Sequence, residues 1–273
     1  MSINFDIVIS SDDYSADMSA GLETMKGACE ATTHIANTIL QKKVSKKLTK
    51  ESKVRNRLKR SFKGSFGMVF SLDTTDVDLK KKMNQIGQQA FSELISYFIS
   101  EALYRESVKL SKKADSVLKE LGDDIHDELI EQLQKSSLHN LHSYSNHFGK
   151  DVKLRYRKSR VTQTVLAHVD RKSYKSLVPK TDNTKITIEA SITRFNINTG
   201  NGRLLIKGDD KTVAFGFLRK YKDIQQHHKK TFTSNLDKCN GIPNDNWETL
   251  KLECTTLKNS CNEVVKYLIR GVL

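Results

Sequence analysis

The sequence predicts an α+β fold: an N-terminal sheet with covering helices and a helical insertion, followed by a small C-terminal β-barrel. Basic and apolar residues alternate in two distant stretches, 54–72 and 152–170, and helical stripes fill the chain between them. Toward the C-terminus, short strand-like runs are separated by glycine-rich turns. We therefore expect an α+β domain at residues 1–178, with a helical segment at 76–147, and a barrel domain at residues 183–273.

The N-terminal domain should begin with a strand, a long helix and a hairpin. Ile3–Ser10 is short, rich in β-branched residues and bounded by polar residues, which is typical of a strand. Between Ser15 and Leu40, apolar residues recur at helical spacing. A lysine-rich connection follows, either a helix end with a loop or a solvated arm. The alternation over Val54–Leu72 then predicts a hairpin.

A helical segment and a second hairpin should complete this domain. Apolar stripes run from Leu79 to Ala102, which predicts one long helix, and then over residues 110–121 and 125–141. These stripes are wide enough to need a partner, either within the chain or in another copy. Val152–Asp170 repeats the alternation of the first hairpin.

The C-terminal domain has the element order of a small barrel. Strands are expected at residues 185–197, 203–207 and 212–218, then a helix at 221–239, then strands at 248–257 and 264–272. Three strands, a helix and two strands is the order of the OB-fold, a small Greek-key barrel. Other small barrels share this order, so the sequence predicts an OB-like barrel among alternatives.

Positive charge is concentrated in two short segments. The 273 residues carry a net charge of +14 at neutral pH. Residues 41–63 hold eleven Lys and Arg against Glu51 alone, a net +10, and residues 150–160 hold six against Asp151 alone, a net +5. A charge excess that served solubility would be spread more evenly. Concentrated basic charge indicates a polyanionic partner: nucleic acid, an acidic membrane surface or an acidic protein.

Many of these basic residues fall on the predicted strands, where they would form rows. Side chains on one face of a strand repeat at about 6.6 to 7 Å, close to the phosphate spacing of an extended nucleic-acid strand. A solvated face, or edge strands protected by charge, would explain the rows without a partner. No recognition-helix motif indicates base-specific readout of DNA. We expect backbone contacts to DNA or RNA from Arg55, Arg57, Lys59, Arg60, Lys63, Lys153, Arg155, Arg157 and Arg160.

Aromatic residues of the predicted barrel are a second candidate for nucleic-acid contact. Phe195, Phe215, Phe217 and Tyr221 lie near several Lys and Arg residues in the sequence. OB-folds stack bases on such rings beside a basic groove. Alternate phenylalanines in a short strand are more often core residues, however, so the core interpretation is favoured.

Histidine and carboxylate clusters have simple structural interpretations. His139, His142 and His147 could hold a metal, but no carboxylate or cysteine is spaced to help them within the same helix. Asp78 and Lys80 have the spacing of a nuclease pair, although a helix cap also explains them. We therefore expect no metal site and no catalytic residue here.

No sequence motif indicates a cofactor, a membrane or a secreted protein. The chain lacks a P-loop, a Rossmann fingerprint and a G-x-S-x-G motif. Its four cysteines include no C-x-x-C pair, which is typical of buried thiols in a reducing compartment. The N-terminus lacks the basic start and apolar core of a secretory signal, and no apolar run is long enough for a membrane span. We expect a cytoplasmic protein without a cofactor.

Two motif groups resemble an uncharacterised bacterial family. One is the basic strand followed by "KGSFGMVF", and the other is "NTGNGRLL" followed by "VAFGF". The resemblance implies an α/β N-terminal domain paired with a C-terminal barrel-like domain, and a place among phage-defence or mobile-element genes. It is weakest over residues 74–150. The family has no settled activity, so the resemblance implies no functional residues.

Three functions are open from the sequence, and charge favours the first. The first is that of a non-enzymatic nucleic-acid-binding protein that senses or docks DNA in a bacterial antiphage defence or mobile-element system. The second is a structural subunit of a multi-subunit complex, which forms homo-oligomers through the helices of residues 76–147 and binds an acidic protein. The third is an enzyme whose acidic residues meet only in the folded chain.

Overall fold

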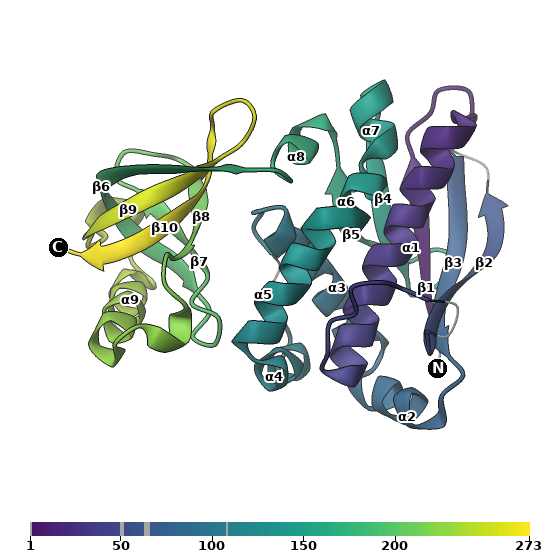
Figure 1. The fold of residues 1–273 in the computed structure, drawn as a ribbon, viewed down its shortest axis with the longest axis horizontal. Coiled ribbons are helices and arrows are strands. Elements are labelled where there is room, and N and C mark those ends of the chain that lie inside the picture. Colours follow the sequence, from purple (N-terminus) through teal and green to yellow (C-terminus); the bar gives the residue numbers. More distant parts are fainter. Residues whose placement is uncertain (1, 50–51, 63–65, 108) are drawn as a thin grey trace. The chain divides into compact units, whose positions relative to one another are not determined.

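The computed structural model describes residues 2–49, 52–62, 66–107 and 109–273 (Figure 1). Within these residues the chain is a mixture of helices and strands with two separate sheets, as the sequence predicts. The chain divides into two compact units. Unit 1 comprises Met1–Leu103 and Ser107–Leu177, and unit 2 comprises Val178–Leu273 together with the short segment Tyr104–Glu106.

Unit 1 is built on a five-stranded antiparallel sheet. The strand order is β2-β3-β1-β4-β5, so the first strand of the chain lies at the centre, between two hairpins. The predicted first strand and both predicted hairpins are confirmed. The strands are β1 (Ile3–Ile9), β2 (Val54–Phe62), β3 (Phe66–Thr74), β4 (Val152–Arg157) and β5 (Gln163–Val169).

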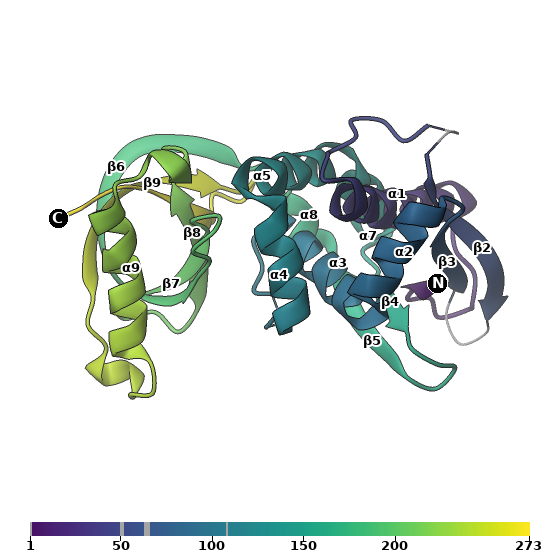
Figure 2. The same cartoon turned by 90° about the horizontal axis from the view of Figure 1, so that it is seen from below.

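The helices of unit 1 gather on one side of this sheet (Figure 2). Helices α1 (Met18–Gln41) and α3 (Gln88–Ala102) pack against the strands. The prediction of one long helix from Leu79 to Ala102 is wrong, because Gly87 adopts a φ of 81° and separates α2 from α3. The other helices are α2 (Val77–Ile86), α4 (Lys112–Leu121), α5 (Asp123–Gln132), α6 (Leu138–Leu141), α7 (Ser143–Phe148) and α8 (Arg171–Lys175).

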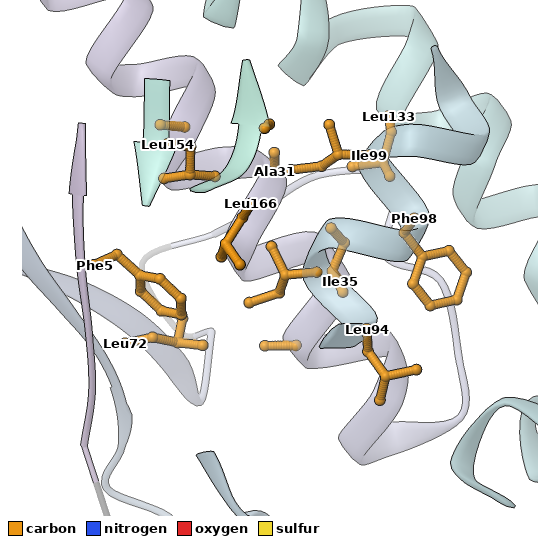
Figure 3. Packing of buried hydrophobic residues seen from close by; sticks show 14 of the residues in the cluster. Phe5, Ala31, Ile35, Leu72, Leu94, Phe98, Ile99, Leu133, Leu154 and Leu166 are labelled. Carbon is orange, nitrogen blue, oxygen red and sulfur yellow. The ribbon is translucent and has the colours of Figure 1, made fainter. Parts of the chain in front are cut away.

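The core of unit 1 lies between the sheet and helices α1 and α3 (Figure 3). Phe5 and Leu154 lie on the sheet side of this core, and Ile35 of α1 and Leu94 of α3 lie on the helix side. The apolar stripes of segment 76–147 contribute to the same buried cluster, so the partner that they need is present within the chain. Their buried members include Leu79, Met83, Leu94, Phe98, Leu118, Leu121, Leu129, Leu133 and Leu141.

One glycine sets the distance between α1 and α6. A Cβ atom at Gly27 would lie 2.1 Å from the backbone nitrogen of Leu141. A side chain there would collide with backbone that cannot easily move aside. The close approach of these two helices therefore depends on glycine at this position.

Unit 2 is a five-stranded sheet that closes on itself. The order is β10-β8-β7-β6-β9, and β9 also pairs with β10. All pairs are antiparallel except β8 with β10. The five predicted strands and the helix between the third and fourth are confirmed. The elements are β6 (Lys180–Phe195), β7 (Gly202–Ile206), β8 (Thr212–Phe217), α9 (Gln226–Cys239), β9 (Leu250–Lys258) and β10 (Val264–Val272).

Phenylalanine rings fill the core of unit 2. Phe215 of β8 and Phe232 of α9 are fully buried, with ring centroids 5.5 Å apart. Phe195 and Phe217 are half-buried and pack on the same ring of α9, at centroid distances of 5.8 and 5.1 Å. The core interpretation of Phe215 is therefore confirmed, and this ring is not available to stack on a base.

Candidate nucleic-acid interface

The basic residues of β4 lie on the face of the unit 1 sheet opposite to α1 and α3, here called the outer face. On β1, Phe5 is buried against the helices, so the next residue, Asp6, points to the outer face. Residues directly opposite each other on paired strands share a face. Arg155 lies opposite Asp6, so it also points outward, and Lys153 and Arg157 follow by alternation.

Strand β2 brings further basic side chains to the outer face. Asn56 points toward α1, where its side-chain nitrogen donates to the carbonyl of Cys29 and the hydroxyl of Thr33. Its neighbours Arg55 and Arg57 therefore point outward. Strands β2 and β4 are three strand spacings apart in the sheet, which is about 14 Å. The two predicted basic rows thus lie on one surface.

A β-bulge in β2 changes which residues belong to this surface. Strict alternation predicts Arg60 and Phe62 on the apolar side, together with Leu58. The register shifts between Leu58 and Arg60, so that Arg60 lies opposite Val69 and joins Phe62 on the outer face. The prediction is wrong beyond this point because the bulge adds one residue, Lys59, to β2 and reverses the alternation.

Two of the predicted phosphate contacts already have a partner within the chain. Asp6 has no exposed surface, and its two carboxylate oxygens accept hydrogen bonds from Nε of Arg155 and Nη1 of Arg157, each at 2.6 Å. From the sequence, both arginines are expected to contact phosphate, but in the structure their side chains are only 23% and 12% exposed. One carboxylate against two guanidinium groups still leaves one positive charge.

An aromatic ring covers this pair of arginines. The ring centroid of Phe62 lies 5.5 Å from Cζ of Arg157 and 5.9 Å from Cζ of Arg155, within the range of cation–π attraction. A Cβ atom at Gly67 would lie 2.4 Å from the ring, so this glycine gives the ring its place on the sheet. Sequence reasoning missed this cluster, although a lone acidic residue in an apolar strand, Asp6, was a signal that basic strands lie beside it.

Two ion pairs lie where β2 begins and β3 ends. Nε of Arg57 lies 3.2 Å from Asp73, and Nζ of Lys53 lies 2.6 Å from Asp76. The carboxylate side chains are 21% and 22% exposed, whereas the basic side chains are 58% and 59% exposed. The hydrogen bond between Lys53 and Asp76 raises the pKa of the amine and lowers the pKa of the carboxyl. The exposed surface of both ion pairs therefore belongs mostly to the basic side chains.

The remaining predicted residues keep their charge unmatched. All are exposed, and no ion pair within the described ranges involves any of them. Arg55 donates its Nε to the backbone carbonyl of Ser52, and Arg160 lies in the turn between β4 and β5. Lys63 lies outside the described residues. The unmatched residues are Arg55, Lys59, Arg60, Lys153 and Arg160.

Two of the histidine and acidic candidates have clear positions in the fold, His142 in the core and Asp78 at the start of a helix. His142 is buried, and its two ring nitrogens lie 2.6 Å from the carbonyl of Leu138 and 2.8 Å from the hydroxyl of Ser173. Asp78 lies in the first turn of α2, so the segment begins a helix as expected, but the cap is Asp76 and not Asp78. Among the residues that the structure describes, no three His, Cys, Asp or Glu side chains gather in a way that could hold a metal ion.

The outer face of unit 1 is the strongest indication of function in the described part of the chain. No helix there combines the length and the apolar character that a membrane crossing requires. Comparison of the chain with protein-family models, with curated proteins and with solved structures found no match.

Proposed function

We propose that the protein binds nucleic acid without catalysis, through phosphate contacts to the outer face of unit 1. The observation that carries this proposal is the meeting of two basic rows, far apart in sequence, on one face of one sheet. Six basic side chains share this face with the two carboxylates that pair with them, Asp6 and Asp73, which leaves a net +4. The six are Arg55, Arg57, Arg60, Lys153, Arg155 and Arg157.

The expected binding is electrostatic and tolerant of sequence. A protein that neutralises phosphates releases their counterions, so its affinity falls steeply as salt rises. With about four phosphates engaged, the slope of log K against log salt would be about −3 for a single strand and about −4 for a duplex. The Asp6 cluster would form the rigid base of the surface, and the exposed side chains of Arg60 and Lys153 would reach phosphates first.

We propose unit 2 as an OB-like barrel that adds a second contact or holds a partner. Its strand order, with the only parallel pair between the third and fifth strands, is that expected of an OB-fold. OB-folds bind oligonucleotides across their second and third strands, which here are β7 and β8. Arg203 on β7 already donates to Thr212 and to the backbone carbonyl of Tyr104, so it supports that face structurally.

The proposal is tested by salt titrations of the full chain with labelled single-stranded and duplex DNA and RNA, read by fluorescence anisotropy. A variant with Gln at Lys59, Arg60, Lys153 and Arg160 should lose affinity and show a flatter salt slope. In the matched control, Gln replaces four exposed helix lysines of unit 1, so the net charge changes by the same amount. These are Lys26, Lys81, Lys119 and Lys135. If the wild-type chain binds none of these nucleic acids at low salt, the proposal is overturned.

The same surface would also attract an acidic protein, which is the alternative function. A subunit of that kind would form a complex of higher mass with its partner and would lose it in the same Gln variant, while nucleic-acid binding would be absent from the start. A role in phage defence or in a mobile element is part of the proposal and is supported by the motif resemblance alone. The cytoplasmic location that we also propose is supported by the cysteine pattern.

A further inference from the structure

We infer that a pocket at one end of the outer face is a seat for the terminal phosphate of a nucleic-acid strand, an inference that rests on the proposed function. The pocket lies where β2 begins and β3 ends and has a volume of about 310 Å³. This volume is at the lower end of the range of about 300 to 1,000 Å³ that is typical of small-ligand sites. Its lining residues are Ser52, Lys53, Arg55, Arg57, Asp73 and Thr75.

The pocket presents basic groups that the fold holds in place. Asp73 binds Arg57 through Nε, and the backbone carbonyl of Ser52 binds Arg55 through Nε. For neither arginine does the described part of the chain record a bond through the terminal Nη atoms. Both guanidinium groups are therefore anchored at one end and retain donors for a ligand. A guanidinium group can bind a phosphate through two parallel hydrogen bonds.

Lys53 adds a third positive charge at the edge of the same pocket. Its ammonium group is held at 2.6 Å by Asp76, which is the N-cap of α2 and lies outside the pocket lining. The hydroxyls of Ser52 and Thr75 complete the polar lining. Among the described residues, the three basic side chains have two carboxylates beside them, Asp73 in the lining and Asp76 next to it, which leaves a net charge of +1.

The donors that Arg55 and Arg57 retain fit a phosphate monoester better than a phosphate within the chain. An internal phosphodiester carries one negative charge, whereas a terminal phosphate carries about −1.5 to −2 near pH 7 and offers three strong acceptor oxygens. A pocket of this size accepts a phosphate with its attached nucleotide, while the open sheet face accommodates the chain that follows. Inorganic phosphate and free nucleotides share this chemistry, so the test must separate them from strand ends.

The test uses the full chain and one short single-stranded DNA sequence in three forms: with a 5′-phosphate, with a 3′-phosphate, and with neither. We expect one phosphorylated form to bind about tenfold tighter than the unphosphorylated form, the gain from one additional charge-assisted contact. Because the second ionisation of a phosphate monoester lies near pH 6, this ratio should grow as the pH rises from about 5 to about 7.5.

Two variants separate the seat from the rest of the outer face. Arg55→Gln should remove the preference for the phosphorylated form. Lys153 lies on the same face but outside the pocket lining. Lys153→Gln should therefore weaken the binding of all three forms and leave the ratio of phosphorylated to unphosphorylated affinity unchanged. Competition with inorganic phosphate should reduce only the excess affinity of the phosphorylated form if the seat is real. Strong competition at low phosphate concentration would identify free phosphate as its ligand.

The outcomes for the seat and for the proposed function are distinct. Equal binding of the three forms, or a preference that survives in Arg55→Gln, would overturn the seat and leave phosphate binding by the outer face intact. Failure of all three forms to bind at low salt would overturn the seat, and the proposed function would fall with it only if duplex DNA and RNA also failed to bind.

Discussion

The carboxylate of Asp6 lies 2.6 Å from Nε of Arg155 and has no surface exposed to solvent. Arg157 binds the second oxygen of the same carboxylate, and Phe62 covers both guanidinium groups. The basic residues of the outer face therefore fall into two groups. One is an internal cluster that holds β1 and β4 together. The other consists of exposed side chains, of which Arg57 pairs with Asp73 and the rest have no carboxylate partner among the described residues.

The first prediction concerns this internal cluster. Replacing Asp6 with Asn leaves two largely buried guanidinium groups without their counter-charge. Removing one partner of a buried ion pair costs about 3 to 5 kcal/mol, so the free energy of unfolding should fall by about that amount. Urea denaturation followed by circular dichroism measures it. Asp73→Asn is the control, because its partner Arg57 is mostly exposed, and it should cost less than about 1 kcal/mol. Equal losses from the two variants would contradict the distinction.

The second prediction concerns single substitutions of exposed basic residues on the outer face. Arg60→Gln and Lys153→Gln should each reduce the slope of log K against log salt by about 1, because each removes one phosphate contact. Their free energy of unfolding should hardly change. Lys81→Gln, in α2 and 71% exposed, should leave the slope unaltered. The proposal fails at these positions if all three variants shift the slope alike.

Much of the fold could be predicted because it depends on local pattern. Alternation within β2–β3 and β4–β5 identifies the hairpins, and glycine-rich turns separate the strands of unit 2. The break at Gly87 was missed because the apolar stripe continues across it, and a helical pattern does not report a φ of 81°.

The candidate site was harder to predict, for a physical reason. The bulge at Lys59 is set by pairing with β3, so the sequence of β2 alone gives no sign of it. Likewise, Asp6 meets Arg155 only because β1 and β4 become neighbours across 149 positions of the chain. Sequence charge therefore locates the basic strands, but the sheet decides which of their charges are neutralised.

The third prediction concerns the contact between Phe62 and Gly67. Gly67→Ala should destabilise the protein by about 1 to 3 kcal/mol, because a Cβ atom there would lie 2.4 Å from the ring. In a background with Phe62→Ala, the same substitution should cost much less, since the ring is gone. A double-mutant cycle measures this coupling by urea denaturation. Additive effects of the two substitutions would show that the ring does not rest on this glycine.

The fourth prediction concerns two cysteines of unit 2. Burial raises the pKa of the Cys254 thiol to about 11, so almost none of it is the reactive thiolate near pH 8. Cys261 is exposed in the connection between β9 and β10. Iodoacetamide at that pH should alkylate Cys261 and leave Cys254 intact until urea unfolds the chain, as mass spectrometry of tryptic peptides would show. Alkylation of Cys254 in the folded chain at a similar rate would contradict its burial.

The fifth prediction follows from a buried histidine on α1. Burial lowers the pKa of His34 below its ordinary value of 6.5, although the charge of Glu30 opposes this. In the unfolded chain His34 takes up a proton near pH 6.5, whereas in the folded chain it does so only at lower pH. The stability that this difference provides is complete above the unfolded pKa and is lost as the pH falls toward the folded pKa. The loss is at most about 1.4 kcal/mol per pH unit.

Thermal unfolding between about pH 7.5 and 5 should therefore show a falling Tm. The dependence should be weaker in His34→Gln, after allowance for the lower Tm of that variant at pH 7.5. An NMR titration measures the pKa of the His34 ring directly, because its signal is followed separately from those of the other seven histidines. Its midpoint should lie below 6.5. A midpoint above that value would mean that the ring gains a proton on folding, and stability would then rise on acidification instead.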